Sequence, residues 1–390
     1  MPAAATSPHQ VPPTPPPPMP PRHPNFVQKV EDFWHRVTEG LELQQLWNQF
    51  QTEARTGYRL YSRDVEARGQ HPQPGRNNWV HTAGEFFWAV LMKLSPAKRV
   101  ILLVALVLLM LGALDFTVNN TRVSFDARTF GGLLILLILV LETADRVIMK
   151  RDLEIAKEIQ HWLVPSEAPE VPGLDVGFVT RAANTVAGDY YDIVPRVEPG
   201  KYLIAIADVA GKSMPAALLM ATFQASLKTL SAASPSLVDL VYGLNRYACD
   251  HSIRGTRFTT AFLAEYDSSN CTLNYVNAGH NPPVLLRGTD VQHLTEGGVP
   301  LGILHDASYQ SGQVQLHKGD MLAIFTDGVV EAENVAGQEF GEDRLVQVLR
   351  LSNNGTAKQV IGQIMANIEA FVATAPQHDD ITCMVVRCVQ

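Results

Sequence analysis

The sequence has few cysteines and no cysteine pair with metal-ligand spacing. Only four of its 390 residues are cysteine, and none forms a Cys-x-x-Cys pair. Such pairs are typical of zinc and redox sites, and dense cysteine spacing is typical of secreted disulfide scaffolds. We therefore expect reduced cysteines in a cytosolic domain, with neither a disulfide framework nor a zinc centre. The four are Cys249, Cys271, Cys383 and Cys388.

Basic charge is also scarce. The chain has 31 Lys and Arg against 39 Asp and Glu, a net charge of −8. A general nucleic-acid binder presents a basic surface, so the composition predicts no nucleic-acid partner. A glycine-rich ATP-binding block is missing too, which argues against a membrane histidine kinase.

The N-terminal region lacks a signal peptide, because no basic segment is followed by an apolar one. Residues 1–24 hold eleven of the 25 prolines, which predicts a disordered tail. Apolar residues at helical spacing between 25 and 65 predict a helical N-terminal region, residues 25–98, to which no chemistry can be assigned.

No apolar run reaches the roughly 18–20 residues that a confident membrane span needs. Val100–Leu114 and Phe130–Leu141 are nevertheless rich in Leu, Ile and Val on all sides, and flanking residues extend both. We expect a two-helix transmembrane hairpin over residues 99–144, with two buried core helices as the alternative. Lysines and arginines outside both ends place the following domain in the cytoplasm, at a bacterial inner membrane.

Residues 145–165 are predicted to form a linker helix. Leu141, Ile148, Ile155 and Trp162 recur every seven residues, which is a thin heptad seam. We expect this helix to pair two chains into a homodimer and to carry a signal to the domain that follows. Unchanged activity and oligomeric state after deletion of residues 1–141 would contradict this expectation.

Residues 166–390 alternate short apolar runs with later helical segments, which predicts an α+β or layered sandwich domain. The expected strands are Leu174–Thr180, Tyr202–Ala207, Thr259–Tyr266, Leu273–Asn277, Val284–Leu286, Ser308–Val314, Met321–Phe325 and Ile381–Arg387. The expected helices are Met214–Leu230, Leu237–His251, Arg344–Leu351 and Ala357–Ala373.

Aspartates stand where these apolar runs begin or end. Asp208 follows one run and Asp327 another, the pair Asp379-Asp380 opens the last, and Asp189 lies in a Gly-Asp-Tyr-Tyr-Asp segment. A carboxylate at the end of a buried strand must be paired or bound to metal, and no matching set of lysines or arginines surrounds these four sites. Carboxylates suit Mg²⁺ or Mn²⁺, and two such ions can activate a water and clamp a phosphoryl group.

Residues 152–390 resemble the SpoIIE/RsbU-type bacterial members of the metal-dependent PPM (type 2C-like) serine/threonine phosphatases. The matching blocks occur in family order. They are residues 156–165, 171–174, 188–192, 208–217, 259–262, 277–283, 298–302, 319–320, 326–332 and 379–382.

The resemblance implies a PPM-type β-sandwich flanked by helices, with two Mn²⁺ or Mg²⁺ ions at one end. It implies that Asp189 contacts both metals, and that Asp208 and the carbonyl of Val209 complete one shell. Asp327 and Asp379 then hold the other ion, although either Asp379 or Asp380 could face it. Asp189, Asp208 and Asp327 are the expected catalytic residues.

Four further residues in these motifs need weighing. Ala187 and Ser213 replace family glycines, and Ser213 costs stability if its position needs a positive φ. His280 would suit a general acid, but its motif is more typical of a turn beneath the sheet. Lys212 could contact phosphate, but a solvated surface lysine is the simpler interpretation. In this family, movement of the helices that follow is thought to switch metal binding on.

The sequence therefore predicts a membrane-anchored, metal-dependent phosphatase that hydrolyses phosphoserine or phosphothreonine on a regulatory protein. An anti-sigma-factor antagonist is a plausible substrate. The alternative is a catalytically weak regulatory module that binds such a partner. The presence of every expected metal ligand favours the enzyme.

Overall fold

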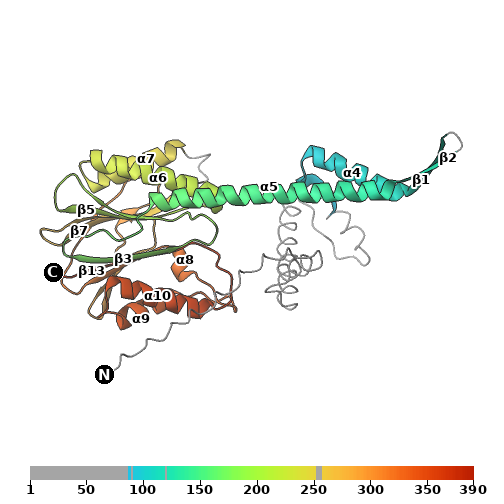
Figure 1. The fold of residues 1–390 in the computed structure, drawn as a ribbon. Helices are drawn as coiled ribbons and strands as arrows, with labels where there is room; N and C mark the ends of the chain where they lie inside the picture. Colours follow the sequence, from blue (N-terminus) through green and yellow to red (C-terminus); the bar gives the residue numbers. More distant parts are fainter. Residues whose placement is uncertain (1–86, 89–90, 119–120, 252–256) are drawn as a thin grey trace, which may run out of the picture. The chain divides into compact units, whose positions relative to one another are not determined.

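The computed structural model describes residues 87–88, 91–118, 121–251 and 257–390, and the chain divides after Leu139 into two compact units (Figure 1). The tail predicted for residues 1–24 and most of the predicted helical region 25–98 lie outside the described residues. The predicted domain limits therefore stay predictions.

The first unit contains two helices joined by a β-hairpin. A Cβ on Gly131 would lie 2.8 Å from the carbonyl oxygen of Ala105, so glycine lets the two helices approach closely. Ala105 and Ala127 are fully buried in the same unit. The elements are α4 (Pro96–Leu111), β1 (Ala113–Val118), β2 (Thr121–Asp126) and the start of α5 (Ala127–Leu163).

The predicted transmembrane hairpin over residues 99–144 is wrong. Among the helices that the structure describes, none is both long enough and apolar enough to cross a membrane. Helix α4 has 16 residues, which at about 1.5 Å per residue falls short of a hydrocarbon core about 30 Å thick. The 37 residues of α5 include an apolar run that ends at the charged residue Glu142. The predictions of a membrane anchor and of an inner-membrane location depended on this hairpin and are corrected with it.

The second unit begins within α5, which ends at Leu163 just before Pro165, as the proline predicts. The heptad residues Ile148, Ile155 and Trp162 expose 59%, 46% and 80% of their surface. An exposed seam leaves the residues of the expected homodimer contact accessible, and the dimer stays a prediction.

Two sheets face each other beyond α5 (Figure 1). The first has the strand order β10-β7-β6-β5-β4, with β11 also paired to β7, and the second has the order β3-β13-β12-β8-β9. The strands of the first sheet are β4 (Tyr190–Pro195), β5 (Lys201–Val209), β6 (Thr259–Asp267), β7 (Thr272–Ala278), β10 (Gly297–Gly298) and β11 (Gly312–Gln315). Those of the second are β3 (Leu174–Arg181), β8 (Val284–Arg287), β9 (Asp290–His293), β12 (Met321–Phe325) and β13 (Ile381–Cys388).

Helices cover the outer face of each sheet, which gives four layers. Helices α6 (Ser213–Ala233) and α7 (Leu237–His251) pack on the first sheet. Helices α9 (Glu342–Leu351) and α10 (Ala357–Val372) pack on the second, and the short α8 (Asp327–Val330) follows β12. The predicted α+β sandwich flanked by helices is confirmed.

The apolar strands are continuous because both of their faces are buried. In β5, Ile204 and Ile206 enter the core between the sheets, whereas Leu203 and Ala205 enter the core beneath α6 and α7. Successive side chains of a strand point to opposite faces, so a strand between two cores carries no polar alternation. The polar residue that ends such a run therefore lies at the end of the sandwich.

Candidate functional site

Asp189 lies in a buried loop immediately before β4. Its side chain is 4% exposed, and Thr326 Oγ1 donates a hydrogen bond to Asp189 Oδ2 at 2.9 Å. Burial raises the pKa of Asp189 well above its usual value, and the charges of Asp208 and Asp380 raise it further. Asp189 therefore faces other carboxylates without a compensating cation.

Asp208 occupies the penultimate position of β5, opposite Thr260 of β6. Burial raises the pKa of Asp208 to about 7, helped by the charges of Asp327, Asp379 and Asp380. The carbonyl oxygen of the next residue, Val209, would lie 3.3 Å from a Cβ on Gly188, beside Asp189. The end of β5 thus directs a carboxylate and a carbonyl toward the same region.

Asp327 is the first residue of α8, directly after β12. Burial raises its pKa, the nearby charge of Asp379 raises it further, and Lys212 opposes the shift. A Cβ on Gly328 would lie only 2.0 Å from the carbonyl oxygen of Asp380. Glycine is therefore required here, because it lets the start of α8 meet the residues that open β13.

The two adjacent aspartates, Asp379 and Asp380, make different contacts. Asp380 accepts backbone hydrogen bonds at both oxygens, from Ala183 N at 2.7 Å and Gly188 N at 2.6 Å. Asp379 Oδ1 instead accepts from the adjacent Asp380 N at 2.9 Å, and its Oδ2 lies 3.1 Å from Lys212 Nζ. Asp380 thus holds the loop that leads to Asp189, whereas the side chain of Asp379 is 41% exposed and contacts a flexible lysine.

The structure therefore brings all of the predicted aspartates to one end of the sandwich, where their charges act on one another. We refer to this group as the carboxylate cluster. Its members are Asp189, Asp208, Asp327, Asp379 and Asp380.

The cluster suits a hard divalent cation by its donors and its charge. All of its donors are oxygen, as Mg²⁺ and Mn²⁺ prefer. The pKa values of Asp189, Asp208, Asp327 and Asp380 are raised by burial and by neighbouring carboxylates. Within the part of the chain that the structure describes, no three His, Cys, Asp or Glu side chains converge closely enough to enclose an ion as they stand. The carboxylates share a region without pointing at one centre, because Thr326, backbone amides and Lys212 occupy several of their oxygens.

Gln160 of α5 is a contact that the sequence did not reveal. Its side-chain nitrogen Nε2 donates to the carbonyl of Ala187 at 2.6 Å, and Ala187 N donates back to its Oε1 at 2.9 Å. This two-point contact fixes the backbone two residues before Asp189. A lone glutamine on a helix carries no pattern that would have identified it. Ala187, which replaces a family glycine, is accommodated with its side chain buried.

His280 lies beneath the sheet, as its motif suggested. Its Nδ1 is 3.0 Å from Thr260 Oγ1, and its backbone N–H donates to Asn277 Oδ1 at 2.7 Å. Complete burial lowers the pKa of His280 to about 4, so the ring is neutral at pH 7. These contacts favour a structural role over that of a general acid.

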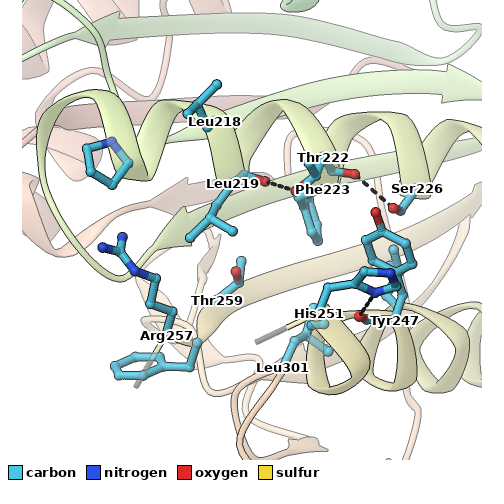
Figure 2. Close-up of a pocket in the computed structure, with 14 residues that line it drawn as sticks. Leu218, Leu219, Thr222, Phe223, Ser226, Tyr247, His251, Arg257, Thr259 and Leu301 are labelled. Carbon is cyan, nitrogen blue, oxygen red and sulfur yellow. Dashed lines mark hydrogen bonds between the residues drawn. The ribbon is translucent and has the colours of Figure 1, made fainter. Parts of the chain in front are cut away.

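Among the hollows of this unit, two border the carboxylate cluster and a third lies apart from it. A groove of about 780 Å³ between the end of α5 and β3 includes Asp189, and a cavity of about 160 Å³ includes Lys212 and Asp379. The third, of about 260 Å³, lies between α6 and α7, whose side chains point into it from two sides (Figure 2). It is mostly apolar and includes no member of the cluster, so it is not the reaction site.

Comparison with known proteins identifies the family of this chain. The family profile described as Stage II sporulation protein E (SpoIIE) matches residues 198–389. Phosphoserine phosphatase RsbU of Bacillus subtilis is 30% identical over 241 residues, which cover 61% of this chain and 70% of RsbU. Phosphoserine phosphatase RsbP of the same organism is 27% identical over 47% of this chain and 46% of its own length.

Solved structures support the fold. The SiaA-PP2C domain of Pseudomonas aeruginosa aligns with a TM-score of 0.56 and 22% identity, over 63% of this chain and 98% of that domain. At this identity the likeness shows the sandwich fold alone. The profile match and the similarity to RsbU show the family as well as the fold. The chain belongs to the SpoIIE family of PP2C-like serine/threonine protein phosphatases.

Proposed function

We propose that this protein is a metal-dependent phosphatase that hydrolyses phosphoserine or phosphothreonine on a regulatory protein. The observation that carries the proposal is the carboxylate cluster, which gathers aspartates from four separate segments at one end of the sandwich, where burial and neighbouring charges raise the pKa values of Asp189, Asp208 and Asp327. Uncompensated buried carboxylates are costly unless they bind a cation, and this arrangement suits one.

The proposed ligands are those that the family resemblance implies, and the structure brings them to one end of the sandwich. Asp189 would be the shared ligand, and Asp208 with the carbonyl of Val209 would hold one ion. Asp327 and Asp379 would hold the other. Asp380 is assigned a supporting role, because both of its oxygens hold the backbone of the loop that leads to Asp189, whereas Asp379 is 41% exposed and contacts its neighbour's amide and Lys212. Two Mn²⁺ or Mg²⁺ ions held there would supply an activated water and would neutralise the phosphoryl charge.

Other residues hold these proposed ligands in position. Thr326 orients Asp189 through its hydroxyl, and Gln160 fixes the backbone just before that loop. Metal ligands that are themselves hydrogen-bonded keep the geometry that a reaction needs. The chain thus combines ligands from four separate segments with contacts that fix them from outside.

The proposed substrate is a phosphorylated regulatory protein, and an anti-sigma-factor antagonist is the class we favour. RsbU and RsbP are both named phosphoserine phosphatases, which supports the phosphate ester of phosphoserine as the bond that is cleaved. The alternative of a weakly catalytic binding module is disfavoured, because a module without catalysis has no need to keep every buried carboxylate.

Hydrolysis of an aryl phosphate and of a phosphoserine protein with Mn²⁺ tests the proposal. We expect Asp327→Asn to lower kcat at least about a hundredfold, because outer contacts of metal ligands alone are worth about 10–100-fold. Chelation with EDTA should abolish the activity, and Mn²⁺ should restore it. The matched control is Asp343→Asn, which removes an exposed carboxylate from the first turn of α9. Equal rates for wild type and Asp327→Asn would overturn the assignment.

A further inference from the structure

Lys212 places a positive charge at the edge of the carboxylate cluster. It is the last residue before α6, in the segment that follows Asp208. Its Nζ lies 3.1 Å from Asp379 Oδ2 and donates to the carbonyl oxygen of His378 at 2.7 Å. The sequence favoured a solvated surface lysine, and the side chain is 57% exposed, but its ammonium group also contacts the proposed metal ligand Asp379.

The surroundings of Lys212 are otherwise acidic. The cavity of about 160 Å³ that it lines also includes Glu331, Glu333 and Glu339. Arg181 lines the same cavity, but its guanidinium contacts Gln377 at 2.8 Å and Glu369 at 3.0 Å. Arg181 is thus held by Gln377 and by Glu369 of α10, whereas Lys212 contacts Asp379 of the cluster.

The contact between Lys212 and Asp379 is easily broken. The two side chains are 57% and 41% exposed, and an ion pair this accessible to solvent contributes little. A lysine stem is flexible and presents three donors that can turn toward a new acceptor. Once Asp379 is used as a ligand, the ammonium group is available for another anion at the same place.

We propose that Lys212 binds the phosphoryl group of the substrate at this edge of the site. The inference rests on the proposed function and deepens it, because it names a residue that recognises the substrate itself. A phosphoryl group carries up to two negative charges and must approach several carboxylates. A mobile ammonium group beside Asp379 offsets that repulsion and donates hydrogen bonds to the phosphoryl oxygens.

Kinetics and binding with the Mn²⁺-loaded full-length protein test this role. We expect Lys212→Ala to raise KM for p-nitrophenyl phosphate about tenfold, the size of one lost charge-assisted hydrogen bond. The inhibition constant of inorganic phosphate should rise by a similar factor. Lys212→Arg, which keeps the charge, should recover most of the loss. Lys358→Ala, an exposed lysine on α10, should change neither constant.

Calorimetric titration separates this role from a merely structural one. If Lys212 only shielded Asp379, its removal would change Mn²⁺ affinity and leave phosphate inhibition unaltered, which would overturn the proposal. Unchanged KM and phosphate inhibition in Lys212→Ala would overturn it as well. Should the wild type hydrolyse nothing, the proposed function fails first. Phosphate binding to the Mn²⁺-loaded wild type and Lys212→Ala would then still decide the role of Lys212.

Discussion

The two helical layers of the sandwich differ in how firmly their helices are anchored. Helix α10 begins with a complete capping box, in which Thr356 Oγ1 accepts from Gln359 N and Gln359 Oε1 accepts from Thr356 N. In α9, Glu342 and Asp343 lie in the first turn and Arg350 in the last, as the helix dipole favours. The N-terminus of α10 and both ends of α9 are thus stabilised by their own sequence.

Helix α6, in the opposite layer, has none of these features. Its N-cap Lys212 makes no side-chain capping bond, no acidic residue lies in its first turn, and no basic residue lies in its last. Its first residue, Ser213, has a φ of 62°, which L-residues adopt at a cost. The apolar cavity of Figure 2 runs along the same helix.

The less anchored helix, α6, is the one that touches the reaction end. A Cβ on Gly188, beside Asp189, would lie 3.3 Å from the Cβ of Ala216 in α6. Ala210 N, two residues after Asp208, donates to the carbonyl of Phe258, which lines the apolar cavity. A shift of α6 therefore changes the surroundings of two proposed ligands, whereas α9 and α10 can stay fixed.

The largest expected effect is on the free energy of unfolding, and it tests whether the two helical layers differ in packing. Ile364 of α10 is fully buried, so Ile364→Ala should lower the free energy of unfolding by about 2–5 kcal/mol. Leu219 of α6 already borders a cavity, and Leu219→Ala should cost less than about 2 kcal/mol. Denaturant unfolding of both variants measures the difference. Equal losses would show that the two layers are packed alike.

A second test concerns the connection from α5 to the metal loop. Gln160→Ala removes both hydrogen bonds to Ala187 and should weaken Mn²⁺ binding about tenfold, as the loss of an outer contact of a metal ligand does. Calorimetric titration with Mn²⁺ measures this directly. Gln363→Ala, an exposed glutamine on α10, is the matched control. If both variants bind Mn²⁺ like wild type, the loop is held by the sandwich alone.

The positions of the aspartates could be predicted because they depend on a local pattern. Strand β12 was predicted with its observed limits, and β5 was predicted two residues short of Val209. Both runs are apolar on two faces, and each ends where a polar residue leaves the core. The prediction of a sandwich fold rested on the same apolar runs.

The missed features depend on tertiary contacts. Strand β4 escaped prediction because Asp192 interrupts its apolar pattern, and this residue is buried only with the help of Tyr190 Oη at 2.9 Å and Lys228 Nζ at 3.0 Å. Asp379 and Asp380 are chemically identical in the sequence, and only the amides of a distant loop distinguish them. The prediction of a transmembrane hairpin is wrong because α4 has only 16 residues and the apolar run of α5 ends at Glu142, so neither described helix is long and apolar enough for a span.

The smallest expected effect tests the strain at the start of α6. Ser213→Gly removes a Cβ from a left-handed backbone conformation, which relieves roughly 1–2 kcal/mol, but adds backbone entropy to the unfolded chain. The net gain in the free energy of unfolding should be below about 1 kcal/mol, measured by thermal or denaturant unfolding in EDTA.

Ser234, at the other end of α6, is the matched control, because its φ of −80° gives glycine nothing to relieve. Ser234→Gly should therefore be neutral or destabilising. A stability gain at Ser213 with unchanged Mn²⁺ affinity would mean that the strain is incidental. A gain accompanied by altered Mn²⁺ affinity would mean that the backbone at the start of α6 helps to set the geometry of the loop that carries Asp208.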